Sequence, residues 1–382
     1  MTDRKLTNES TDESNKLIGV PVDQSMEELW KFEIVDQILP KHTQLCKDIQ
    51  WGTRGVTYTM PDVAEVILKD AKDNSYAIEC LTTTENKLIG VVLCFKHRPL
   101  VLGSQIDAHY VSLFAVVEEM RGKKLGFKML EQGLQYLQRT VGTTPTLIWG
   151  LIEGDNDRSL HRANQMNSQP IRQLKPFTAA WEFPSLDKNV ELLIESEREG
   201  MIKLLTEAYT DHSIIDFNAV KSQDRYVVYR SSKDNTITAG CYIMPIKMQF
   251  QQFKSKSDEI TYKTLSRWSW LTPLFKPGLT AEPFTFSLIY AKLGHEKDLM
   301  RILETYQALG YSWAMSFYDP GSSVAQRIID TCNNWRTRGI LADIIESGMP
   351  KVCHVQALTI NMTPEQIVLL FEKPSAPIWH GY

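Results

Sequence analysis

The chain has 382 residues, of which 43% are hydrophobic and 23% charged, with a formal net charge of −4 and a pI near 6.1. A chain of this length is too long to fold around one hydrophobic core of ordinary size, so we expect two domains. Without a basic excess, nucleic acid is not an expected partner. Since no run approaches the roughly 18 apolar residues that cross a bilayer, no integral membrane segment is expected either.

Six cysteines are scattered without any C-x-x-C pair, and most lie in apolar runs. We therefore expect reduced core cysteines, no metal site and a cytoplasmic location. Residues 1–25 are predicted to form a flexible tail, because they begin with a polar, mixed-charge run that lacks the apolar core of a signal peptide.

Residues 26–46 predict one or two short helices. The patterns at 76–81 and 87–96 predict strands, and the polar turn between them indicates an antiparallel hairpin. A third strand is expected at 108–117. It runs directly into a helix at 121–139, where apolar residues recur at helical spacing.

Further along, residues 146–152 predict a fourth strand, 158–166 a second helix and 170–183 a closing hairpin. The order over this half is β-β-β-α-β-α-β. The strand pattern stops at Pro184, and a charged amphipathic stretch begins at residue 190. A domain boundary is therefore expected between 184 and 190.

The second half follows a similar outline, although no repeat is detectable at the sequence level. It predicts two related mixed α/β units (an α/β or α+β fold), spanning 26–184 and 190–382. The expected elements are strands at 225–230, 237–244, 284–291 and 312–317, helices at 297–309 and 323–335, and closing strands at 352–358 and 366–372.

The stretch VSLFAVVEEMRGKKLGFKML, residues 111–130, combines an apolar strand, a short polar turn and a helix start. Unpaired N–H groups at a helix N-terminus carry partial positive charge and hold a pyrophosphate well. Gly122 and Gly126 allow the backbone to come close, while Arg121, Lys123 and Lys124 add positive charge. The turn therefore predicts a site for the pyrophosphate of CoA.

With Arg121 and Gly126 after an apolar strand, this turn resembles the R/Q-x-x-G-x-G/A motif of the GNAT acyltransferases, with Lys124 in place of the middle glycine. The basic turn is also similar to that of N-myristoyltransferases, which are tandem GNAT folds. The flanking runs KLIGVV and QPIRQLKPF and the two-unit length support the comparison. The resemblance implies tandem GNAT-like mixed β-sheet units with flanking helices.

The same resemblance implies an acyl-CoA-dependent N-acyltransferase without a metal. The expected donor is acetyl-CoA by default, or another acyl-CoA. The expected acceptor is an amine of a peptide or small molecule. One alternative is an N-myristoyltransferase-like enzyme acting on N-terminal glycine. Residues 1–30 lack that family's aromatic clamp, and the chain continues past the last strand to Tyr382 rather than ending at a catalytic carboxylate. A non-catalytic tandem GNAT binding module is the other alternative, because the usual tyrosine acid is not evident.

The resemblance also implies roles for individual residues. The amides of Leu113 and Phe114 would face the thioester carbonyl, Glu118 or Glu119 would hold or deprotonate the amine, and His161 would protonate the leaving thiol. The simpler interpretation is that Glu118, Glu119 and His161 are solvated side chains on a turn and a helix. The donor is implied to contact Ala115, Val116, Val117, Arg121, Gly122, Lys123, Lys124, Leu125, Gly126, Asn156 and Ser159.

An aromatic stretch at residues 262–279, with Trp268, Trp270, Phe275 and the nearby Phe284, has two interpretations. It lines an acyl or peptide groove, because aromatic side chains give a large contact area, or it fills the core of the second domain. The sequence alone does not separate them.

Overall fold

The computed structural model describes residues 29–51, 56–71, 74–217, 220, 225–253, 255–267, 279–339, 342–347 and 349–373. The predicted tail at 1–25, the aromatic residues Trp268, Trp270 and Phe275, and the terminal Tyr382 lie outside these ranges.

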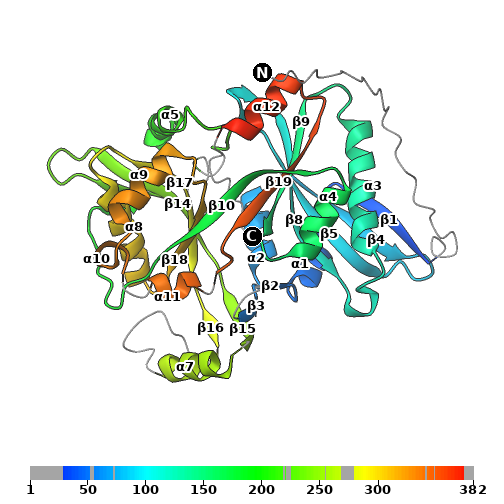
Figure 1. The fold of residues 1–382 in the computed structure, drawn as a ribbon, viewed down its shortest axis with the longest axis horizontal. Coiled ribbons are helices and arrows are strands. Elements are labelled where there is room, and N and C mark those ends of the chain that lie inside the picture. The colour runs from blue at the N-terminus through cyan, green and yellow to red at the C-terminus, as the bar shows by residue number, and fades with distance from the viewer. Residues whose placement is uncertain are drawn as a thin grey trace, which may run out of the picture.

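Twelve of the described strands form one mixed sheet that runs through both halves of the chain (Figure 1). Their order is β1-β4-β5-β8-β9-β19-β10-β18-β17-β14-β13-β11. The first half supplies β1 (Trp30–Val35), β4 (Ser75–Thr82), β5 (Leu88–His97), β8 (Asp107–Val116), β9 (Thr146–Glu153) and β10 (Gln169–Ala179). The second supplies β11 (Val190–Leu192), β13 (Tyr226–Arg230), β14 (Ile237–Pro245), β17 (Phe284–Ala291), β18 (Ala314–Tyr318) and β19 (Cys353–Ile360).

The strand order has the same pattern when it is followed inward from either edge of the sheet. In each half, three antiparallel strands lead to a parallel pair, β8 with β9 and β17 with β18. A helix connects the members of each pair, because parallel neighbours need a crossover. The mixed α/β fold expected from the sequence is thus confirmed, while the division at 184–190 stays a prediction.

The last strand of each half pairs with strands of the other half. β19 lies between β9 and β10, antiparallel to both, and β10 is antiparallel to β18. The sheet is therefore continuous across the middle of the molecule, and β19 brings side chains of the second half next to β9.

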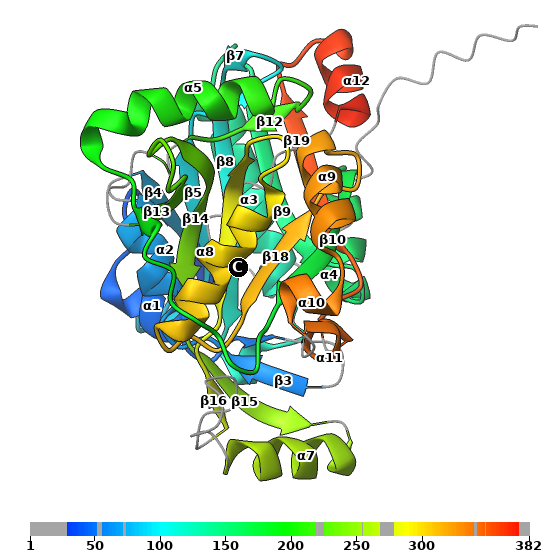
Figure 2. The ribbon, with the colours of Figure 1, turned by 90° about the vertical axis from the view of Figure 1, so that its left-hand side faces the viewer.

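The helices pack on this sheet and at its ends (Figures 1 and 2). α3 contacts β1, β4, β5 and β8, and α8 contacts β13, β14 and β17 in the corresponding way. The bounds are α1 (Pro40–Cys46), α2 (Val63–Ala71), α3 (Leu125–Thr140), α4 (Asp157–Gln165), α5 (Arg198–Ala208), α7 (Lys256–Ser266), α8 (Glu296–Ala308), α9 (Ser323–Cys332), α10 (Trp335–Arg338), α11 (Ala342–Ser347) and α12 (Pro364–Glu372).

Two small sheets lie beside the large one. The first joins β2 (Gln50–Trp51) and β3 (Val56–Thr59) of the first half to β15 (Met248–Phe253) and β16 (Thr280–Ala281) of the second. Figure 2 shows β15 and β16 leading to α7 at one end of the molecule. The second small sheet contains β6 (Leu100–Val101), β7 (Ser104–Gln105) and β12 (Ile214–Ile215).

The core consists of two apolar clusters on opposite faces of the first half's strands. The larger cluster continues through the second half and includes the fully buried Phe284, so this one aromatic residue belongs to the core. The smaller cluster lies under α3, where Leu125, Met129 and Leu137 are buried at helical spacing. Burial of one such side chain contributes about 1.5–3 kcal/mol, which fixes α3 against β4 and β5.

Three elements differ from the sequence expectations. The first part of 26–46 is the strand β1 rather than a helix, because Trp30, Phe32 and Ile34 alternate with charged residues and WKFEIV pairs with β4. Residues 170–183 form no hairpin, because β10 is one strand held between β19 and β18. Residues 366–372 are helical, because a capping box between Thr363 and Gln366 starts α12.

All six cysteines are buried and unpaired, as the sequence predicts. Among the described helices, none has both the length and the apolar character that a membrane crossing requires.

Candidate functional site

The parallel strands β8 and β9 are paired over only part of their length. Their register runs from Asp107 opposite Thr146 to Tyr110 opposite Trp149. Beyond this point β8 continues to Val116 in pairing with β5, while β9 pairs with β19 on its other side. The two strands therefore separate, and the last part of β8 has an open edge.

β8 contains a bulge at the beginning of this open edge. The pairs Val92 with Phe114 and Cys94 with Val111 leave one residue of β5 opposite two residues of β8. Such a bulge bends the strand and changes the direction of its backbone groups. The bulge falls at Ser112 and Leu113, so it includes one of the two residues whose amides the sequence predicts to face a thioester.

The backbone amides after the bulge alternate in direction. The Val117 N–H donates to the Ile89 carbonyl oxygen at 3.0 Å, so it is already bonded within the sheet. Because N–H groups of an antiparallel strand alternate between its two sides, those of Phe114 and Val116 point to the open edge. The Phe114 amide is therefore well placed for a ligand in the opening, and the Val117 amide is not.

In the turn between β8 and α3, Lys124 replaces the middle glycine of the motif and adopts a backbone conformation that is typical of glycine. Gly122 has a φ of 86°, and Lys124, the N-cap of α3, has φ 59° and ψ 9°. This left-handed conformation favours glycine, and a lysine adopts it at a cost of about 1 kcal/mol or more. Arg121, Gly122, Lys123 and Lys124 are all exposed, and the Arg121 Nε donates to the Val116 carbonyl oxygen at 3.4 Å.

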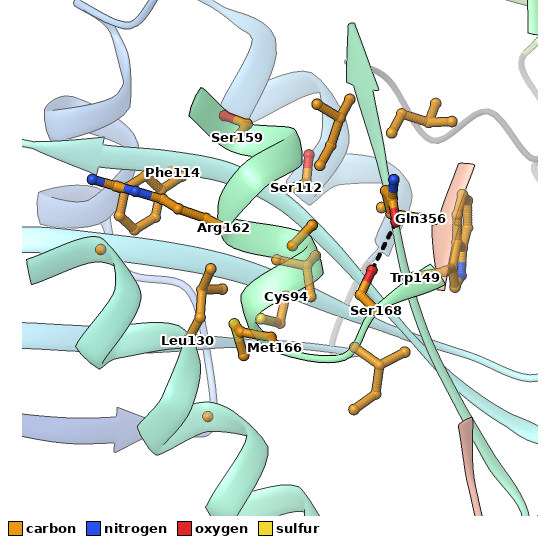
Figure 3. A pocket seen from close by; sticks show the side chains of 18 of the residues that line it. Cys94, Ser112, Phe114, Leu130, Trp149, Ser159, Arg162, Met166, Ser168 and Gln356 are labelled. Carbon is orange, nitrogen blue, oxygen red and sulfur yellow. Dashed lines mark hydrogen bonds between the residues drawn. The ribbon is translucent and has the colours of Figure 1, made fainter. Parts of the chain in front are cut away.

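Gly126 is required by a close approach at the start of α3. A Cβ atom on this residue would lie 2.3 Å from Cζ of Phe114 and 3.0 Å from Nη1 of Arg162. Figure 3 shows these two side chains side by side, Phe114 from β8 and Arg162 from α4. The first turn of α3 thus lies against an aromatic ring and a guanidinium group.

A cavity of 430 Å³ occupies the region where β8 and β9 separate and extends between α3 and α4. Phe114, Gly126 and Arg162 line it at the start of α3. Asn156, the N-cap of α4, also lines it and accepts a hydrogen bond from the Ser159 N–H at 3.1 Å. Burial lowers the pKa of the Arg162 guanidinium, and the nearby charge of Arg158 adds to this.

One arm of the cavity runs beneath α3 and is apolar. Its walls combine residues of β4 and β5 with residues of α3, among them Gly133, which is buried against Ile78. Burial raises the pKa of the Cys94 thiol to about 12, so this group stays protonated. The arm is lined by Tyr76, Ile78, Cys94, Leu130, Gly133, Leu134 and Leu137.

The cavity also reaches the opposite face of the sheet. There it is lined by Trp51 of β2, by Trp149 and Glu153 of β9, and by Gln356 of β19. The Ser168 hydroxyl donates to Oε1 of Gln356 at 2.9 Å, as the dashed line in Figure 3 marks. The opening thus passes through the sheet, and the second half of the chain contributes to its far wall through β19.

Of the predicted site residues, Phe114, Gly126, Asn156 and Ser159 line the cavity. Leu113, Ala115 and Leu125 are buried in the core, and Val116 and Val117 pack against the cluster under α3. Glu118 and Glu119 are exposed on the short 3-10 helix Glu118–Met120, and His161 is exposed on α4. The cavity is not lined by Leu113, Ala115, Val116, Val117, Glu118, Glu119, Leu125 or His161.

Sequence reasoning missed the contributions of distant elements. Trp51 and Gln356 come from two strands about 300 residues apart, and no local pattern connects either with the donor motif. Arg162 belongs to a helix already expected near the site, but its approach to Gly126 depends on the packing of α4 against α3. Within the described ranges, no group of three or more His, Cys, Asp or Glu side chains is placed to hold a metal ion.

A model of a known protein family matches part of the first half of the chain. Residues 43–166 match the model of the Acetyltransferase (GNAT) family. No curated protein matches the chain by sequence. Residues 43–166 therefore carry a GNAT domain, with β8, the turn and α3 inside it.

Solved structures resemble the chain over nearly its whole length. Saccharomyces cerevisiae N-myristoyltransferase with bound myristoyl-CoA has a TM-score of 0.55 at 9% identity, covering 95% of this chain and 92% of that one. The same enzyme with bound myristoyl-CoA and inhibitors gives 0.56 at 10% identity, covering 99% and 93%. A GCN5-related N-acetyltransferase from Sphaerobacter thermophilus gives 0.47 at 10% identity, covering 87% and 98%. The chain thus shares the overall fold of N-myristoyltransferase.

Proposed function

From a GNAT domain at residues 43–166 within an N-myristoyltransferase fold, we propose that the chain is an acyl-CoA-dependent N-acyltransferase. The observation that carries this proposal is the opening between β8 and β9. It brings the part of β8 that is not paired with β9, the first turn of α3 and a cavity together in one site. No metal is needed for this chemistry.

The arrangement gives each part of an acyl-CoA a matching surface. The pantetheine amides extend the open edge of β8 as an additional strand, using the Phe114 and Val116 backbone. The Phe114 N–H, next to the bulge, polarises the thioester carbonyl. The diphosphate binds at the start of α3, where the helix dipole and the basic turn favour negative charge.

The acceptor amine enters from the opposite face of the sheet, near Trp51 and Glu153. The cavity passes through the sheet, so an amine on this side reaches a thioester held on the other. A peptide or a small molecule suits this entrance. The proposed roles of Glu118 and His161 stay predictions, and neither side chain lines the cavity. The unpaired cysteines support a reducing, cytoplasmic location.

Thermal denaturation of the full chain with CoA, acetyl-CoA and myristoyl-CoA tests donor binding. A ligand present at 100 times its Kd stabilises the folded state by about 2.7 kcal/mol, so at least one donor is expected to raise the Tm. Release of free thiol from the stabilising donor, measured with peptides carrying free or blocked N-termini, then tests transfer. Binding without acceptor-dependent thiol release would instead support a non-catalytic binding module.

A longer acyl donor, as in the N-myristoyltransferase-like alternative, is favoured by one specific observation. The arm beneath α3 is apolar and continuous with the thioester end of the site. Acetyl-CoA, the default donor, leaves this arm empty, whereas an acyl chain of several methylenes fills it. Each buried methylene contributes about 0.8 kcal/mol, so affinity is expected to increase with chain length.

The variant Leu134→Trp tests the apolar arm, because Leu134 lines it from α3. The larger ring is expected to weaken binding of long acyl-CoA donors about tenfold or more and to leave acetyl-CoA binding unchanged. Gln132→Trp, on the exposed side of the same helix, is the matched control. Equal loss of acetyl-CoA and long-chain donors in Leu134→Trp would contradict a chain-binding role.

A further inference from the structure

The second half of the sheet contains a turn that corresponds to the proposed phosphate site. β17 leads through Gly294, with a φ of 81°, into α8, just as β8 leads through Gly122 into α3. In the second half, an acidic side chain of the protein already occupies the place that corresponds to the phosphate site. The carboxylate of Glu296, which is only 4% exposed, accepts a hydrogen bond from the Gly294 N–H at 3.2 Å.

Arg327 of α9 completes this internal anion site. Its Nε lies 2.9 Å from Oε1 of Glu296, and its Nη2 donates to the Ala291 carbonyl oxygen at 2.5 Å. A guanidinium group from the following helix therefore reaches back to the start of α8 and pairs with a buried negative charge. The first turn of α8 holds an anion that belongs to the chain itself.

The first half has the same guanidinium but no acid. Arg162 of α4 approaches Gly126 at the start of α3, and the first turn of α3 contains no acidic residue. No carboxylate of the described residues forms an ion pair with Arg162. Its side chain lines the cavity, whereas the corresponding Arg327 is paired with Glu296.

The two arginines occupy closely corresponding places in the fold. Each belongs to the helix that follows the second strand of a parallel pair, β9 or β18. Arg162 is six residues after the N-cap Asn156, and Arg327 is five residues after the N-cap Ser322. The chain thus contains two versions of one anion site, one filled by its own carboxylate and one open to a cavity.

We infer that Arg162 is the side chain that pairs with the diphosphate of the donor, and that each chain binds a single acyl-CoA because Glu296 fills the equivalent place in the second half. This inference rests on the proposed function and assigns a specificity-determining residue to it. The two oxygens of a diphosphate suit the planar fork of the guanidinium. The exposed lysines of the turn then contribute only long-range attraction.

Isothermal titration of the full chain tests the inference with three probes that separate the parts of the donor. CoA carries the diphosphate and the 3′-phosphate, 3′-dephospho-CoA carries the diphosphate alone, and pantetheine carries neither. Wild type is expected to bind one CoA per chain. Arg162→Gln is expected to weaken CoA and 3′-dephospho-CoA by the same factor, about tenfold or more, because one charge-assisted hydrogen-bonding group is lost. Its binding of pantetheine is expected to match wild type.

Two variants serve as controls. Arg158→Gln removes the same charge from an exposed position one turn earlier on α4, and its affinity for CoA is expected to stay within about threefold of wild type. Arg162→Lys keeps the charge but loses the fork, so it is expected to bind CoA more tightly than Arg162→Gln and more weakly than wild type. Arg162 is partly exposed, so both Arg162 variants are expected to melt like wild type.

Different results would contradict the proposed function and the inference about Arg162. If wild type binds none of CoA, acetyl-CoA and myristoyl-CoA, the proposed function is wrong. If wild type binds CoA, the inference is overturned when Arg162→Gln binds it as tightly, when Arg158→Gln loses as much affinity, or when two CoA molecules bind per chain.

Discussion

At the scale of single residues, Gly126 and Lys124 are the two positions of the donor motif with unusual local demands. Gly126 leaves room for the Phe114 ring, while Lys124 accepts a backbone conformation that most residues avoid. The first feature concerns ligand binding and the second concerns stability. Two substitutions therefore have different expected results.

Gly126→Ala is expected to weaken donor binding with only a small loss of fold stability. The added Cβ would lie 2.3 Å from Cζ of Phe114 and therefore displaces this ring, which lines the cavity. Alanine in place of glycine favours the helix by about 0.5–1 kcal/mol, which offsets part of the crowding. Thermal shifts with and without CoA measure both effects. An unchanged affinity for CoA would show that Phe114 does not border the ligand.

Lys124→Gly is expected to raise the free energy of unfolding by up to about 1 kcal/mol, because glycine adopts φ near 59° without strain. Lys123→Gly is the matched control, since it removes the same charge and adds the same backbone freedom without relieving a positive φ. Urea denaturation of the two variants compares them directly. Equal destabilisation by both substitutions would argue against strain at Lys124.

At the scale of elements, the paired end of β8 and β9 holds the opening in place. His109 lies there, opposite Ile148, and its Nδ1 is 3.2 Å from the Tyr76 hydroxyl oxygen. Burial, followed by the charge of Lys96, lowers the pKa of His109 to about 4. The neutral imidazole is therefore the form that packs between β8 and α3.

This lowered pKa predicts acid sensitivity. The unfolded chain binds a proton at His109 near pH 6.5, and the folded chain binds one only near pH 4. The contribution of neutral His109 to the free energy of unfolding is therefore fully present above pH 6.5 and is lost as the pH falls toward 4. The loss from this residue reaches about 3 kcal/mol. Urea denaturation between pH 7.5 and 4 measures it, and His109→Gln is expected to show a smaller change. An equally steep loss in that variant would assign the effect to other groups.

The elements also show what sequence alone supports. The hairpin of β4 and β5, the passage from β8 into α3, and α8 follow local periodicity, and all were predicted near their observed bounds. β10 and α12 were misassigned, because the partners of β10 lie more than 130 residues away and the Thr363 capping signal competed with an apolar run. In the site, Gly126 and Phe114 follow from the motif, whereas Trp51 and Gln356 meet the cavity only through long-range packing.

At the scale of the whole molecule, the position of β19 makes the two halves depend on each other. β19 fills the place between β9 and β10, and residues of β19 border the cavity. Without it, two long buried edges of the first half are exposed, and unpaired backbone groups at such edges destabilise the fold.

Expression of residues 1–184 alone is therefore expected to give an unstable or aggregating product without a cooperative thermal transition. Co-expression with residues 185–382 is expected to restore a stable complex, because β19 then pairs with β9 and β10. Size-exclusion chromatography and circular dichroism measure both outcomes. A cooperatively folded first half that binds CoA alone would show that β19 is dispensable.

The most direct measurement of the central claim is a crystal structure of the full chain with a non-hydrolysable acyl-CoA analogue. We expect electron density for the pantetheine along the open edge of β8, the carbonyl beside the Phe114 amide, and the diphosphate between the first turn of α3 and Arg162. Density for the analogue at any other place, with the opening between β8 and β9 unoccupied, would contradict the assignment of this site to the donor.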